Sequence, residues 1–95
     1  MRVKIVYLGL IRSRIGKNEE QCEVADNSSL DDLLKKLTKN YGEKLHFLFE
    51  VKNESRIDPT FIMTVNGILR DPFRESGVTL KDGDIITFMT LISGG

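Results

Sequence analysis

A leucine-rich stripe near the middle of the chain constrains the fold more than any other feature. Its apolar residues recur at the spacing of one face of an α-helix: Leu30, Leu33, Leu34, Leu37 and Tyr41. Residues 27–29 offer N-cap side chains, and Ser28 and Ser29 each precede an aspartate at capping-box spacing. Gly42 suits the left-handed residue beyond a helix end. The pattern predicts one amphipathic helix that must be covered by another layer.

Two strands are expected before this helix. Residues 2–8 are rich in β-formers and alternate two faces, one of which carries Val3, Ile5 and Tyr7. Residues 11–17 mix basic side chains with a glycine, which is typical of a hairpin loop. Residues 20–24 then predict a second strand, antiparallel to the first.

Three strands are expected after the helix. Phe61–Val65 and Ile68–Arg70 flank Asn66-Gly67, the pair that a two-residue type I′ hairpin turn requires. The turn Lys81-Asp82-Gly83-Asp84 leads into a last strand at Ile85–Met89. Residues 43–60 fit a helical turn and a strand almost equally, and we favour a short helical turn followed by a mobile loop.

The order of elements is therefore β-β-α-β-β-β. It predicts an α+β fold of the β-grasp, or ubiquitin-like, type, with a mixed sheet of about five strands packed on one main helix. We expect residues 1–90 to form this domain and residues 91–95 to form a flexible C-terminal tail that ends in Gly-Gly.

Composition narrows the class of partner. Fourteen basic and 14 acidic residues give a net charge of zero, so no global field attracts nucleic acid or an anionic membrane. The single cysteine, Cys22, excludes an internal disulfide. No apolar N-terminal segment has signal-peptide or transmembrane length. We expect a cytoplasmic protein that binds neither nucleic acid directly nor a membrane.

The final residues, Gly94 and Gly95, predict chemistry on the main chain. Glycine has no Cβ, so a Gly-Gly tail can pass extended through a narrow channel and present its carboxylate to a partner's active site. Gly95 supplies the reacting carbon and Gly94 allows the threading. If the natural chain continues beyond residue 95, the pair needs proteolytic exposure.

The motifs together resemble the MoaD and ThiS group of ubiquitin-like sulfur carriers, which includes archaeal MoaD-like small modifiers. The resemblance covers nearly the whole chain and rests on the following segments: Val3–Leu8, Ser29–Leu34, Val65–Gly67, Leu80–Asp84 and Ile92–Gly95. Thr90-Leu91-Ile92 stands where bacterial members commonly have two prolines, and is more similar to the eukaryotic ubiquitin-related modifier.

This resemblance implies that an adenylating, ubiquitin-activating-like enzyme uses ATP and Mg²⁺ to activate Gly95. A persulfide donor then converts the acyl-adenylate into a thiocarboxylate. The resemblance further implies the small subunit of molybdopterin synthase, which delivers sulfur for the molybdenum or tungsten cofactor with its tail in a larger catalytic subunit. Isopeptide bonds to lysines of target proteins and sulfur transfer for tRNA thiolation require the same tail.

A partner-binding surface is expected around the tail. Met89, Leu91, Ile92 and Ser93 lie where the last strand leaves the core, and Ile68 with Leu69 extends the patch from the hairpin. The alternative is that some of these residues fill the core or cover the helix end.

The remaining candidates have structural explanations. Cys22 is expected to be a small buried apolar residue, and His46 a surface or loop residue. The acids at positions 31, 32, 82 and 84 suit caps and turns. The sequence predicts no metal site and no bound cofactor, and it has no phosphate-binding glycine loop. The rival class is a noncovalent β-grasp interaction module, which tolerates changes at Gly95.

Overall fold

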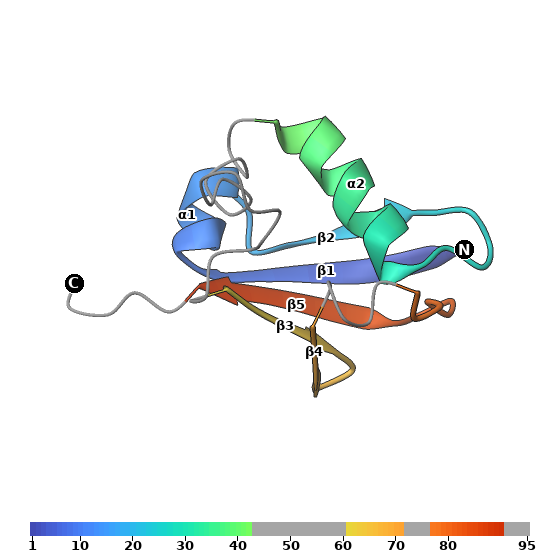
Figure 1. Ribbon diagram of the computed structural model, residues 1–95. Helices are drawn as coiled ribbons and strands as arrows, with labels where there is room; N and C mark the ends of the chain where they lie inside the picture. Colours follow the sequence, from blue (N-terminus) through green and yellow to red (C-terminus); the bar gives the residue numbers. More distant parts are fainter. Residues whose placement is uncertain (43–60, 72–76, 91–95) are drawn as a thin grey trace, which may run out of the picture.

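Five strands form one mixed sheet, and two helices pack on the same face of it (Figure 1). The computed structural model describes residues 1–42, 61–71 and 77–90. The elements are β1 (Arg2–Gly9), α1 (Leu10–Ile15), β2 (Glu19–Glu23), α2 (Leu30–Tyr41), β3 (Phe61–Val65), β4 (Ile68–Arg70) and β5 (Ile85–Thr90). The expectation for residues 43–60, which include His46, lies outside the described residues.

The strand order is β2-β1-β5-β3-β4, so the first and last strands lie side by side. β1 and β5 run parallel, whereas β2, β3 and β4 pair antiparallel with their neighbours. The parallel pair requires a crossover, and α2 lies within it. This topology is the predicted β-grasp fold.

The core lies between the sheet and the helices. The strands bury the side chains of alternate residues, including Val3, Ile5 and Tyr7 on β1 and Ile86 and Phe88 on β5. The leucine stripe of α2 faces them, with its four leucines at most 9% exposed. Cys22 belongs to this cluster, as expected for a small buried apolar residue. Burial raises the pKa of its thiol.

The second of the two predicted capping boxes is formed. Ser29 Oγ accepts a hydrogen bond from the backbone of Asp32 at 3.1 Å, and the Ser29 backbone donates to Asp32 Oδ2 at 2.9 Å. Ser28 is instead buried and donates its hydroxyl proton to the carbonyl of Ala25 at 2.6 Å. At the other end, Gly42 has the expected positive φ of 51°, but its ψ of −117° lies outside the left-handed helical region.

The loop expected at residues 11–17 is wrong, because the chain forms α1 there. Ile11 and Ile15 are four residues apart and are 1% and 5% exposed, so one short helical face fills the end of the core. Gly9 and Gly16 bound the helix with φ values of 68° and 84°. The arginines occupy the exposed face, which explains why the segment resembles a polar loop in sequence.

The Asn66-Gly67 turn adopts the predicted type I′ geometry, with φ of 52° and 83°. Asn66 also has a role that the turn signal does not reveal. Its Nδ2 donates to Asp84 Oδ1 at 2.9 Å, and its Oδ1 accepts from the backbone of Ile85 at 2.9 Å. Asp84, 9% exposed, accepts a further bond from the Lys81 backbone at 2.8 Å. The hairpin is thereby tied to the beginning of β5.

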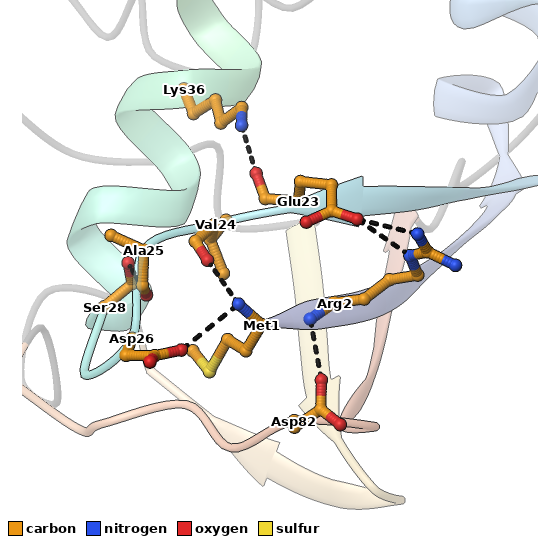
Figure 2. A network of polar contacts seen from close by, with 9 residues as sticks. All are labelled: Met1, Arg2, Glu23, Val24, Ala25, Asp26, Ser28, Lys36 and Asp82. Carbon is orange, nitrogen blue, oxygen red and sulfur yellow. Dashed lines mark hydrogen bonds and ion pairs between the residues drawn. The ribbon is translucent and has the colours of Figure 1, made fainter.

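Polar contacts hold the beginning of β1 (Figure 2). The Met1 ammonium group donates to the carbonyl of Val24 at 2.9 Å. The Arg2 guanidinium pairs with Glu23 at 2.7 Å, and the Arg2 backbone donates to Asp82 Oδ1 at 2.8 Å. Asp82 thus has the turn role expected of it. These contacts lie at the opposite end of the sheet from the end of β5 (Figure 1).

Candidate functional site

The predicted reactive tail continues from the centre of the sheet. β5 lies between β1 and β3, and its last residue, Thr90, pairs with Gly9 on one side and Phe61 on the other. A central strand held on both edges gives the tail a fixed point of departure. Leu91, Ile92, Ser93, Gly94 and Gly95 lie outside the described residues, so their roles, and the division of the chain at residue 90, stay predictions.

An apolar row crosses the sheet one residue before that point. Met89 pairs with Leu8 on β1 and with Ile62 on β3, on the face turned away from the helices. Leu8 is 37% exposed, and Met89 and Ile62 are half-buried. Met89 is therefore neither a core residue nor fully exposed. Leu8 and Ile62 were missed by the sequence analysis, although strand alternation places both on the outer face.

The hairpin residues divide between the two faces of the sheet. Leu69, 67% exposed, pairs with Thr64, which pairs with Thr87, so it lies on the same face as Met89. Ile68 pairs with the buried Val65 and therefore points to the helix side, where the edge position leaves it 58% exposed. The structure supports Leu69 but not Ile68 as an extension of the Met89 row.

A buried polar cluster lies beneath the helices. Tyr7 is fully buried, and its hydroxyl donates to Glu20 Oε2 at 2.6 Å. The Tyr41 hydroxyl donates to the same oxygen, and Lys17 Nζ lies 3.5 Å from Glu20 Oε1. The Tyr7 and Tyr41 rings meet edge to face with centroids 6.4 Å apart. This cluster joins β1, β2 and the end of α2.

The cluster alters the acidity of its members. Burial followed by the Glu20 hydrogen bond raises the pKa of Tyr7 far above its usual range. Desolvation acts to raise the pKa of Glu20, but the hydrogen bonds from Tyr41 and Tyr7 and the Lys17 ammonium outweigh it, and the pKa is lowered. Glu20 therefore stabilises the fold as a carboxylate rather than as an acid or base catalyst.

We expect the chain to lose stability in acid partly through Glu20. A carboxyl whose pKa is lower in the folded state stabilises that state above its unfolded pKa, about 4.3 for Glu, and the stabilisation disappears as pH falls through the folded pKa. Urea unfolding at about pH 6 and about pH 3 should show a smaller acid loss for Glu20→Gln than for the wild type. Glu23 and Asp32, whose pKa values are also lowered, are present in both proteins and cancel. Equal losses in the two proteins would contradict the assignment.

Other kinds of site receive no support from the described residues. Within residues 1–42, 61–71 and 77–90, no three His, Cys, Asp or Glu side chains gather to hold a metal. None of the helices in those ranges is both long and apolar enough to span a membrane.

Comparison with solved structures finds the same fold in several proteins. SAMP1 from Haloferax volcanii superposes with a TM-score of 0.81 at 15% identity, over 100% of both chains. The putative molybdopterin converting factor, subunit 1, from Pyrococcus furiosus gives 0.74 at 22% identity, over 97% of this chain and 99% of that one. A chain of the complex of subunits 1 and 2 of the molybdopterin-converting factor from Helicobacter pylori gives 0.65 at 22% identity, over 100% of both chains. All three likenesses are to the fold.

A comparison with curated protein sequences gives no match. The ThiS family model, however, matches residues 5–95, which include the whole described fold beyond the first four residues and the terminal glycines. The chain therefore belongs to the ThiS family, a family of ubiquitin-like sulfur carriers and modifiers.

Proposed function

We propose that this chain carries sulfur as a thiocarboxylate on Gly95, and that it donates this sulfur in molybdopterin biosynthesis as the small subunit of molybdopterin synthase. The observation that carries the proposal is the family match extending through Gly94 and Gly95. The end of β5 supports it, because a strand paired on both edges holds the start of the tail while five residues remain to reach a partner.

The chemistry requires activation by a partner. An α-carboxyl group has a pKa of about 3.5, so Gly95 is an anion at neutral pH and resists nucleophilic attack. Its oxygen attacks the α-phosphorus of ATP in an adenylating enzyme, which forms the acyl-adenylate and releases pyrophosphate. The terminal sulfur of a persulfide donor then attacks the acyl carbon and AMP leaves. A thiol reductant cleaves the resulting S–S bond and frees the thiocarboxylate.

The proposed acceptor complex has support from a structural neighbour. The Helicobacter pylori protein is seen with subunit 2 of its molybdopterin-converting factor, so a chain of this fold can assemble with a second subunit. The row of Leu8, Met89 and Ile62 beside the start of the tail is the part of this surface suited to such a contact. ATP and Mg²⁺ belong to the activating partner, not to this chain.

The second candidate is a protein modifier, in which a lysine amine of a target attacks the activated Gly95 carbonyl and forms an isopeptide bond. The similarity to SAMP1, a small archaeal modifier protein, over the whole of both chains favours considering it. Sulfur transfer for tRNA thiolation uses the same thiocarboxylate. Both share the activation step with the main proposal and differ from it in the acceptor.

The test is the intact mass of the protein isolated from its native host under non-oxidising conditions. We expect a gain of about 16 Da from exchange of one oxygen for sulfur, located at the last residue by fragmentation and removed by thiocarboxylate-specific alkylation. Oxidation of any of the three methionines gives a similar gain, but it lies elsewhere and is reversed by sulfoxide reduction. An unmodified mass, with no adenylate formed in host extract and ATP, would favour the noncovalent module.

A further inference from the structure

Helix α1 places exposed positive charge beside the start of the tail. It follows Gly9 directly, and Gly9 is the residue that pairs with Thr90 at the end of β5. Figure 1 shows α1 above the arrowhead end of β5, and the two elements are in contact. Arg12, Ser13 and Arg14 form the exposed side of the helix. Any protein that receives the tail approaches the domain at this end.

The helix is held rigidly enough to act as a recognition element. Ile11 and Ile15 anchor it in the core, and glycines with positive φ fix its direction at both ends. The Gly16 backbone donates to the carbonyl of Arg12 at 2.8 Å and closes the last turn. The position of Arg12 therefore follows from the packing of the domain rather than from a loose loop.

Arg12 takes part in none of the ion pairs found among the described residues. The three acids of the nearby strand β2 each hold a different cation: Glu19 pairs with Lys4, Glu20 with Lys17 and Glu23 with Arg2. The chain as a whole is neutral, so this charge does not reflect a general excess of basic residues. A solvent-exposed cation in this setting favours an acidic surface on an approaching protein.

Distance restricts which protein that is. Five residues follow Thr90, and a fully extended chain of five residues spans at most about 17 Å. A six-residue helix is about 9 Å long. A protein that holds the Gly95 carboxylate in its active site must therefore bring its surface within reach of α1, unless it approaches from the far side of the sheet.

We propose that α1 docks on an acidic surface beside the channel of the adenylating enzyme, with Arg12 as the principal contact. This inference rests on the proposed function, since it assumes that Gly95 enters such an enzyme. Arg12 acts in recognition and takes no part in the reaction at Gly95, so its removal should weaken binding and leave the chemical step intact.

The test is ATP–pyrophosphate exchange with the purified adenylating enzyme of the host, titrated with wild-type protein, Arg12→Glu and Arg12→Gln. We expect the KM for this protein to rise about tenfold in Arg12→Glu and less in Arg12→Gln, with kcat within about twofold of the wild type. High salt should raise the wild-type KM toward that of Arg12→Glu. The matched control is Lys81→Glu, because Lys81 is an exposed cation that precedes β5 at the opposite end from Thr90.

The possible failures are distinguishable. An unchanged KM in Arg12→Glu, or an equal rise in Lys81→Glu, would overturn the docking role while exchange by the wild type still supported the carrier function. Absence of exchange with the wild type at every concentration would overturn the proposed function, and the docking role with it. Thermal unfolding of each variant shows whether a change in KM reflects loss of the fold.

Discussion

Deletion of Gly95 is expected to abolish adenylation of this chain and to leave its melting temperature unchanged. The deletion shortens the tail by one residue, which withdraws the carboxylate by about 3.5 Å from the position it would occupy in a partner's active site. A misplacement of about 1 Å can already cost about 100-fold in rate, so we expect a loss of at least that size. The measurement is ATP–pyrophosphate exchange with the host's adenylating enzyme, together with thermal unfolding.

The matched control is a glycine change within the domain. A Cβ added at Gly77 meets no atom within 4 Å, so Gly77→Ala should retain both exchange activity and stability. Full activity after loss of Gly95 would contradict the carrier function and support the noncovalent module. Loss of the fold on deletion would show that the tail packs on the domain, contrary to the predicted boundary at residue 90.

Local signals in the sequence are sufficient to predict most of the fold. The stripe of α2, its Ser29 cap and the Asn66-Gly67 turn each depend on residues close together in the chain, and each is confirmed. The parallel pairing of β1 with β5 is a different matter, because nothing local specifies it. It followed from the order of elements and the resemblance to a known family, and the structure confirms it.

Helix α1 could not be predicted from the same signals. Six residues are too short for a clear periodic pattern, and arginines beside a glycine are equally typical of a loop. Only burial decides the matter, since Ile11 and Ile15 become part of the core. The i, i+4 spacing of these two isoleucines between glycines was the one available signal.

The candidate site could be predicted in part. The glycine pair is visible in sequence because its chemistry is on the main chain, whereas the surrounding surface depends on strand register. Register places Leu69 on the same face as Met89 and Ile68 on the other, which the sequence analysis did not separate. The cluster around Glu20 was also missed, because Tyr7, Glu20 and Tyr41 lie far apart in the chain and meet only after folding.

Replacement of Phe88 by alanine is expected to cause the largest loss of stability among the single substitutions considered. Phe88 is 1% exposed on the central strand β5, and its ring stacks on that of Tyr7 at 6.2 Å with 21° between the planes. Truncating a buried phenylalanine costs about 3–5 kcal/mol, which is a large part of the roughly 5–15 kcal/mol that stabilises a domain. At about 4–8 °C per kcal/mol for a domain of this size, the melting temperature should fall by at least about 12 °C.

Thr87→Ala is the matched control for this substitution, because Thr87 is half-buried on the opposite face of the same strand and should change stability by less than about 1 kcal/mol. Equal shifts for the two variants would show that the packing of β5 against the helices does not dominate stability. The substitution also tests how the domain serves its tail. Phe88 contacts neither the tail's glycines nor a partner in the proposed function. At a temperature where Phe88→Ala is still folded, adenylation should therefore remain near the wild-type rate, and it should fail on warming together with the fold. That dependence would separate the holding of β5, which belongs to the core, from the reaction at Gly95.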